Sequence, residues 1–257
     1  MSQAWMIASG KGGVGKSTIT ASLAVALARR QLPTVAVDTD IGLRSLDMLL
    51  GLQSKIVYDV IDVANRDCKL KYALVQYAQS PSLSLLPASQ LGTSADLNEA
   101  LMERIVRKLK KRFSYVLMDA PAGLERGVVS TLRNADHTLL VVTPDDVSIR
   151  DAERLIHLLE QNHKPRPMLI VNRVIPDLVA HGEMYSPQTV ANTLDVPLLG
   201  YVPEDRCVLR ALNQHHTVMD EDCPARQAME RISQRFLGEY VPMPAFEKKR
   251  RLFGRRC

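Results

Sequence analysis

The chain has 257 residues, of which 46% are hydrophobic, and a formal net charge of +5. This length suits one α/β domain with a short appendage, and the apolar content is enough for a sizeable core. No apolar run approaches the roughly 18 residues of a membrane-spanning helix, and the first residues lack a secretory pattern, so we expect a cytoplasmic protein. The four cysteines include no C-x-x-C pair, which argues against a zinc or iron–sulfur site made by this chain alone.

Short apolar runs alternate with longer helical patterns along the first 200 residues. The expected strands are residues 5–9, 34–38, 82–86, 115–118, 138–143, 168–171 and 198–202. The expected helices between them include residues 17–30, 95–112 and 148–161. Most of the strands are continuous apolar runs, which is typical of strands covered on both faces. The alternation predicts an α/β fold with a single doubly wound, mostly parallel sheet and helices on both faces.

A glycine-rich loop with the sequence GKGGVGKST follows the first expected strand and precedes the first expected helix. It satisfies the G-x-x-x-x-G-K-[ST] pattern in the context that the pattern requires, so we predict that it binds ATP. Backbone N–H groups and the helix N-terminus would hold phosphate oxygens, with Lys16 at the β- and γ-phosphates and Ser17 on Mg²⁺. The residues assigned to the loop are Gly10, Lys11, Gly12, Gly13, Val14, Gly15, Lys16, Ser17 and Thr18.

Three aspartates stand where expected strands end: Asp38, Asp40 and Asp119. In parallel sheets, ligands bind beyond the carboxyl ends of the strands, so these carboxylates should face the phosphates. Asp119 follows an apolar strand, as a Walker B aspartate does, and we assign Asp38 and Asp119 to the metal with Ser17. We assign Asp40 to the water that attacks the γ-phosphate. The competing interpretation is that each aspartate is a helix cap or a turn residue.

Lys11, the second residue of the loop, distinguishes this chain from most other P-loop proteins. Together with the segments 38–47 (DTDIGLRSLD) and 119–125 (DAPAGLE), the string KGGVGKST resembles the deviant Walker A (MinD/ParA) family, and within it the septum-site-determining ATPases. The resemblance spans nearly the whole chain. It implies a homodimer in the ATP-bound state, in which Lys11 reaches the partner's phosphates, and therefore a monomer that hydrolyses ATP poorly. Lys11, Lys16 and Asp40 are then the catalytic residues.

The same resemblance assigns roles further along the chain. Asn172 corresponds to the residue that recognises adenine, and Pro203, Glu204 and Asp205 to the loop that closes over the base. The helix containing residues 148–154 corresponds to the face shared by regulatory partners, which would be a MinC-like division inhibitor and a MinE-like regulator that stimulates hydrolysis. Two substitutions depart from the family pattern, at Ser45 and Ala120, and neither removes a group that the chemistry needs.

The C-terminal end divides into three parts. A last helix is expected at about residues 225–240 and completes an ATPase domain of residues 1–240. Two prolines in residues 241–244 make a linker. Residues 245–257 (AFEKKRRLFGRRC) carry six basic residues and one acidic residue, which accounts for the whole charge excess. This amphipathic tail predicts contact with an anionic membrane surface through Phe246, Lys248, Lys249, Arg250, Arg251, Leu252 and Phe253. A solvated basic tail is the alternative.

These observations predict an ATPase that binds the inner membrane surface in its ATP state and regulates septum placement by recruiting a division inhibitor. One tail should bind weakly, whereas two tails in a dimer should bind well through effective concentration. A flagellar regulator of the same family is disfavoured because the loop begins at Gly10, which leaves no room for an N-terminal partner-activating extension. A DNA-partition ATPase is disfavoured because the body is neutral, so no nucleic acid is expected. An iron–sulfur carrier on this fold would need suitably placed cysteines.

Overall fold

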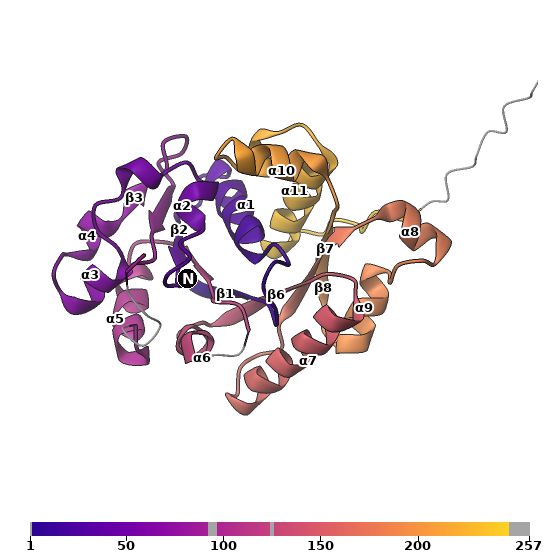
Figure 1. Cartoon of the computed structure of the whole chain (residues 1–257), viewed down its shortest axis with the longest axis horizontal. Coiled ribbons are helices and arrows are strands. Elements are labelled where there is room, and N and C mark those ends of the chain that lie inside the picture. The colour runs from indigo at the N-terminus through magenta and orange to yellow at the C-terminus, as the bar shows by residue number, and fades with distance from the viewer. Residues whose placement is uncertain (1, 92–96, 124–125, 247–257) are drawn as a thin grey trace, which may run out of the picture.

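The computed structural model describes residues 2–91, 97–123 and 126–246 as a sheet between two layers of helices (Figure 1). Within these residues, eight strands form one sheet of order β3-β4-β2-β5-β1-β6-β7-β8. Neighbouring strands run parallel except β3, which is antiparallel to β4. The strands are β1 (Gln3–Ala8), β2 (Thr34–Asp38), β3 (Val75–Gln76), β4 (Leu83–Leu86), β5 (Tyr115–Asp119), β6 (His137–Val142), β7 (Met168–Val174) and β8 (Leu198–Pro203). The predicted doubly wound, mostly parallel fold is confirmed.

The helices cover both faces of this sheet. They are α1 (Lys16–Arg29), α2 (Leu46–Leu49), α3 (Val60–Asn65), α4 (Leu70–Ala73), α5 (Glu99–Leu109), α6 (Arg126–Arg133), α7 (Asp146–Gln161), α8 (Pro176–His181), α9 (Pro187–Leu194), α10 (Arg206–Asn213) and α11 (Pro224–Phe236). Two short 3₁₀ turns, η1 (Gln53–Lys55) and η2 (Val218–Asp220), complete the described elements. Figure 1 shows α1, α10 and α11 above the sheet and α5, α6, α7 and α9 below it.

Alternate residues of the central strands fill two separate cores. In β1, Met6 packs with residues of α5, α6 and α7, whereas Ile7 packs with residues of α1 and α11. Both side chains have no exposed surface. Because successive side chains of a strand point to opposite faces, the continuous apolar runs seen in the sequence are required for a sheet covered on both sides.

Several helix ends differ from the predicted ranges for local reasons. Helix α5 begins at Glu99 because the Asn98 side chain caps it by accepting a hydrogen bond from the backbone N–H of Leu101 (3.1 Å). Helix α11 ends at Phe236, short of the predicted residue 240, and Gly238 then adopts a φ of 85°. Glycine accepts this left-handed conformation without strain, and it directs the chain away from the helix axis.

The segment after α11 lies against the folded body. The guanidinium of Arg235 donates hydrogen bonds to the carbonyls of Val241 (2.7 Å) and Pro242 (2.8 Å), and the Tyr201 hydroxyl donates one to Pro244 (3.4 Å). The ring of Phe246, expected at the membrane, packs on Tyr201 with 4.9 Å between centroids. The other residues assigned to the membrane lie outside the described part of the chain, so their role stays a prediction.

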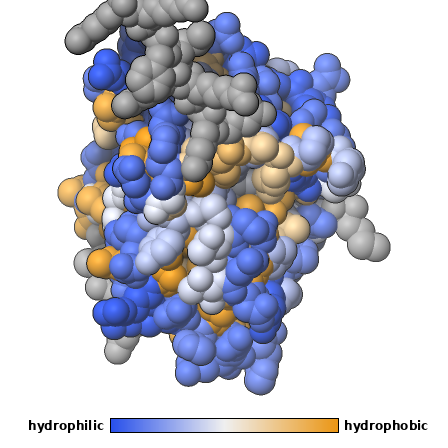
Figure 2. All heavy atoms as spheres, turned by 90° about the vertical axis from the view of Figure 1, so that its right-hand side faces the viewer, coloured by the Kyte–Doolittle hydropathy of each residue, from blue (hydrophilic) through white to orange (hydrophobic). Residues whose placement is uncertain are grey.

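Polar side chains predominate on one face of the described part of the chain. Figure 2 shows one face on which apolar side chains form small groups separated by hydrophilic ones. Among the described residues, no helix combines the length and apolar character needed to cross a bilayer.

Candidate nucleotide site

The glycine-rich loop connects β1 to α1 and borders a cavity of about 480 Å³. Gly13 and Gly15 adopt φ values of 78° and 91°, which favour glycine. Gly15 is the N-cap of α1, and no side chain caps this helix end. The first N–H groups of α1 are therefore left to bind an anion, as at other phosphate sites. Lys11, Lys16, Ser17, Thr18, Asp40, Ser45, Leu212 and His215 are among the residues that line the cavity.

Close packing holds the loop in place at both ends. A Cβ atom on Gly10 would lie 2.6 Å from the Cβ of Asp151 in α7 and closer still to its backbone carbonyl. A Cβ atom on Gly15 would fall on the side-chain amide of Asn172. That amide donates a hydrogen bond to the carbonyl of Val14 (2.7 Å), so Asn172 braces the loop from β7. Its contact with adenine stays a prediction.

A buried ion pair lies beneath the loop. The Lys16 ammonium contacts Oδ1 of Asp119 at 2.9 Å, and the Thr20 hydroxyl donates to the same oxygen at 3.1 Å. All three residues are buried. The other carboxylate oxygen, Oδ2, has no partner among the described residues. Such an oxygen is costly to leave unpaired, and it suits a Mg²⁺ ion bound through water, so the residues present fit this ion.

Asp38 stands beside Asp119 in the paired register of β2 and β5. Its Oδ1 accepts a hydrogen bond from the backbone of Asp40 (3.1 Å), and its Oδ2 accepts two from Ser45 (2.9 Å) and Leu46 (3.1 Å). Burial and the Asp119 charge raise the pKa of Asp38 to about 7, against the lowering effect of these backbone bonds and of Lys16. Asp38 therefore holds the loop between β2 and α2, and its predicted role as a metal ligand stays a prediction.

The raised pKa of Asp38 predicts that the stability of the protein depends on pH. Because the folded pKa of about 7 lies above the ordinary carboxyl pKa of 3.8, the contribution of Asp38 to stability is full below pH 3.8 and is lost as pH rises through 7. In magnesium-free buffer, the free energy of unfolding of the wild type, measured by urea titration relative to Asp38→Asn, should fall between pH 5 and 7. The slope should be at most about 1.4 kcal/mol per pH unit, with a plateau above about pH 8. A difference that stays flat or rises would contradict this.

Asp40 lies at the mouth of the same site. It is half-buried and lines the cavity with Ser17 and Lys16. Burial raises the pKa of its carboxyl, Lys16 lowers it and Asp119 raises it. A carboxylate in this position can accept a hydrogen bond from a water molecule in the cavity, which is what the predicted role requires.

Lys11 is held by its own chain. Its ammonium contacts both carboxylate oxygens of Asp145 at 3.1 and 3.4 Å. Asp145 also caps α7 by accepting a hydrogen bond from the backbone N–H of Ser148 (2.9 Å), and it accepts another from the Thr143 hydroxyl. Burial opposes these contacts, but the hydrogen bonds and the Lys11 charge lower the pKa of Asp145 overall. The lysine therefore lies at the border between the loop and α7.

A second, smaller pocket adjoins the loop. Asn172, Pro203, Glu204 and Asp205 line it together, as their predicted contact with the base requires. Its remaining wall includes Val208, Leu209 and Leu212 of α10, which the sequence did not suggest.

Comparisons with known proteins agree with this geometry. The ParA family model, described as "NUBPL iron-transfer P-loop NTPase", matches residues 1–237. The septum site-determining protein MinD of Helicobacter pylori is 43% identical over 96% of this chain and 95% of its own. The Bacillus subtilis MinD is 40% identical over 97% and 94%. The chain belongs to the MinD family of ParA-type P-loop NTPases.

Solved MinD structures share the fold. The MinC:MinD complex of Aquifex aeolicus superposes with a TM-score of 0.87 and 36% identity, covering 95% of this chain and 99% of the other. The Pyrococcus horikoshii MinD complexed with Mg-ADP gives a TM-score of 0.83 and 26% identity, with coverage of 92% and 96%. As a MinD family member, the chain is a P-loop ATPase that acts in septum-site determination. The predicted family and enzyme class are confirmed.

The structure also brings in residues that the sequence did not single out. Thr20 shares Oδ1 of Asp119 with Lys16, and Asp145 binds Lys11. Asp145 follows the end of β6, so the rule that polar residues after parallel strands face the ligand could have found it. Thr20 lies one helical turn after Lys16 on α1, and this spacing alone would have indicated a shared face.

Proposed function

We propose that this chain is an ATP- and Mg²⁺-dependent dimerising ATPase that cycles on and off the inner face of the cell membrane and places the septum by recruiting a division inhibitor. The observation that carries the nucleotide part is the buried Oδ2 of Asp119, which has no partner among the described residues and lies below a helix N-terminus without a side-chain cap. Together they suit a metal-bound phosphate group.

The residues of the site divide the work of hydrolysis. Gly12 to Thr18 would bind the phosphates through backbone N–H groups. The Lys16 ammonium, which contacts Asp119 in the single chain, would then also contact the phosphate oxygens. Ser17 and Asp119 would hold Mg²⁺, which when bound offsets charge on the phosphate oxygens. Asp40 would orient the water in line with the γ-phosphate. Positioning and charge neutralisation are the main contributions in phosphoryl transfer.

The dimer would complete the site. Lys11 is bound to Asp145 in the single chain, and in the proposed dimer it would leave this carboxylate and contact the phosphates of the partner. Hydrolysis per subunit should therefore increase with protein concentration until the dimer is saturated. The solvent-exposed side chains of Leu43 and Met48, which border the cavity, would be covered in this state.

The tail would make membrane binding depend on which nucleotide the protein holds. Its predicted basic and apolar side chains would bind anionic headgroups and the acyl boundary, and two tails in one dimer would act together. The MinC:MinD complex named among the relatives supports a MinC-like partner for this chain, and α7 is the proposed face for it and for a MinE-like regulator. No nucleic-acid partner is proposed, because the charge of the chain outside residues 245–257 is balanced.

Liposome co-sedimentation tests this proposal. With anionic vesicles, the full chain should sediment with ATP and Mg²⁺ and remain in the supernatant with ADP. Deletion of residues 245–257 should reduce the ATP-dependent bound fraction at least about tenfold, because two weak tails act through effective concentration. The deletion variant should still dimerise with ATP in sedimentation velocity, which is the matched control. Equal binding of the variant and the full chain would overturn the membrane role of the tail.

A further inference from the structure

Two cysteines that are far apart in the sequence meet beside the base pocket. The carboxylate of Asp205 and the sulfurs of Cys207 and Cys223 all lie within 4.8 Å of one another. Cys207 lies in the first turn of α10, and Cys223 is the N-cap of α11. Sixteen positions separate the two residues, so no short motif in the sequence announces the pair. We propose that Cys207 and Cys223 form a reversible disulfide when the protein meets a peroxide.

The two sulfurs differ in exposure and surroundings. Cys223 is 4% exposed, and burial raises the pKa of its thiol to about 11. Cys207 is half-buried, and the guanidinium of Arg210 lies 3.3 Å from its sulfur. Cys207 is thus the more accessible of the two sulfurs, and it accepts a hydrogen bond from a cationic side chain. Cys207 is therefore placed to react first and Cys223 to resolve the product.

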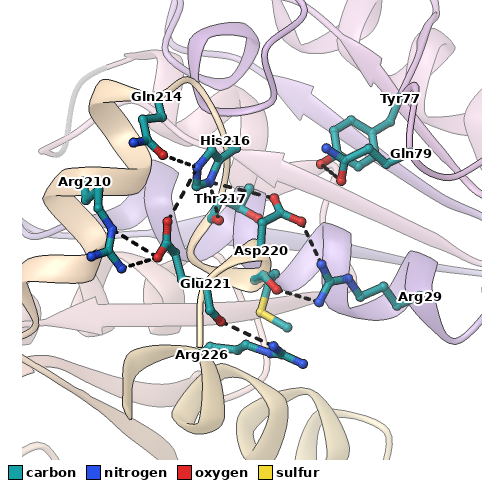
Figure 3. A network of polar contacts seen from close by, with 11 residues as sticks. Arg29, Tyr77, Gln79, Arg210, Gln214, His216, Thr217, Asp220, Glu221 and Arg226 are labelled. Carbon is teal, nitrogen blue, oxygen red and sulfur yellow. Dashed lines mark hydrogen bonds and ion pairs between the residues drawn. The ribbon is translucent and has the colours of Figure 1, made fainter. Parts of the chain in front are cut away.

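Arg210 is held in this position by a network of charges (Figure 3). Its Nε donates to Glu221 at 3.1 Å, and Glu221 in turn lies 3.6 Å from the His216 ring. The same guanidinium therefore bridges Glu221 and the Cys207 sulfur. A cation against the sulfur opposes a bound metal ion at the same atom. Both oxygens of Asp205 are also engaged, with the backbone N–H groups of Cys207 (2.9 Å) and Ala225 (3.2 Å). These contacts favour thiol chemistry over metal binding.

The reaction proceeds in two steps. The Cys207 thiolate attacks one peroxide oxygen, so that an S–O bond forms, the O–O bond breaks and the leaving oxygen takes up a proton to give water or an alcohol. The Cys223 sulfur then attacks the sulfenic acid at Cys207. The S–S bond forms, the S–O bond breaks and hydroxide leaves with the Cys223 proton as water. Two electrons pass from the two sulfurs to the peroxide, and a dithiol reductant reverses the change.

The bond would act on the nucleotide site through α10. Val208 follows Cys207 directly and lines the base pocket with Asp205. A disulfide requires the sulfurs to approach to about 2.05 Å, which draws the first turn of α10 towards α11. The Asp205 carboxylate lies within 4.8 Å of both sulfurs and lines the same pocket, so this movement would also displace it. We expect the oxidised protein to bind ADP about three- to tenfold more weakly, because the pocket wall moves.

Peptide mapping after brief treatment with hydrogen peroxide tests the proposal on the full chain. The expected result is a loss of about 2 Da and a Cys207–Cys223 cross-link, both reversed by dithiothreitol. Cys223→Ser should instead accumulate a sulfenic acid at Cys207 that dimedone traps, whereas Cys207→Ser should leave Cys223 unlabelled. Cys68→Ser is the matched control and should form the disulfide normally. Burial and the nearby Asp62, Asp59 and Asp67 raise the pKa of the Cys68 thiol, so this residue should react more slowly.

The wild-type measurements do not depend on the folding of any variant. Oxidation of Cys68 at the same rate as Cys207, or no cross-link at a peroxide concentration that oxidises free cysteine, would overturn the proposal. Stoichiometric zinc in the purified protein that protects both thiols until a chelator removes it would also overturn it, in favour of a metal site. ADP affinity that is equal in the oxidised and reduced forms would refute the coupling to the base pocket. None of these outcomes depends on dimerisation or membrane binding.

Discussion

Gly10→Ala is expected to abolish nucleotide binding and to lower the free energy of unfolding by about 3 kcal/mol, since overpacking against fixed atoms costs about 1–3 kcal/mol or more. The added Cβ would overlap the backbone of Asp151, which cannot rotate away as the end of a flexible side chain can. The loop or α7 must then shift, and the N–H groups of the loop lose their common orientation. Titration with a fluorescent ADP analogue would measure nucleotide binding, and urea unfolding would measure the change in stability.

Gly12→Ala is the matched control for the packing argument. Gly12 lies two residues further along the same loop, and a Cβ atom there would meet only the Ala122 Cβ, at an ordinary distance of 3.9 Å. We expect the free energy of unfolding of this variant to stay within about 1 kcal/mol of the wild type, because the added Cβ makes no contact close enough to displace the loop. Equal losses of stability in the two variants would show that the contact with α7 is not the cause.

Lys16→Met should reduce ATP hydrolysis by at least about a hundredfold, because removal of one group that stabilises transition-state charge costs about that much. It should also destabilise the protein without nucleotide by about 3–5 kcal/mol, as expected when one partner of a buried ion pair is lost. Among the residues that the structure describes, the Asp119 carboxylate would keep only the Thr20 hydroxyl, and it would lie beside Asp38 with less compensating charge. Phosphate release assays and urea unfolding would measure both losses.

Lys11→Met is expected to reduce hydrolysis without a large loss of stability. Lys11 pairs with Asp145 at the surface, where the side chains are 32% and 45% exposed, so its removal should change the free energy of unfolding by at most about 1 kcal/mol. Hydrolysis should still fall if Lys11 completes the partner's site. A stability loss for Lys11→Met as large as that for Lys16→Met would contradict the distinction between an exposed and a buried pair.

The glycine-rich loop and its place between β1 and α1 could be predicted from the sequence because its pattern is local. Gly15, Lys16 and Ser17 are adjacent, and the loop that contains them has to follow a strand and precede a helix. The aspartates could be placed because parallel strands end at one edge of the sheet, which brings Asp38 and Asp119 into the same register. Regular alternation of strands and helices was enough to predict the layers.

Other features depend on contacts between distant segments, which periodicity does not report. The glycine at position 10 is required by α7, about 140 residues away, and nothing in the loop reveals that approach. Cys207 and Cys223 meet because the first turn of α10 lies close to the start of α11. The spacing of the two cysteines in the sequence had argued against a shared site. The short helices α2, α3 and α4 went unpredicted because four to six residues are too few to show a helical period.

The contact between Lys11 and Asp145 sets a limit on how firmly the single chain keeps this lysine. An exposed pair contributes at most about 1 kcal/mol, which corresponds to roughly a fivefold preference for the bound over the released side chain. About one molecule in six would then have Lys11 released at any moment, before nucleotide arrives. The contact with Asp145 therefore holds Lys11 only weakly, and in the proposed dimer its loss would add little to the free-energy cost of pairing two chains.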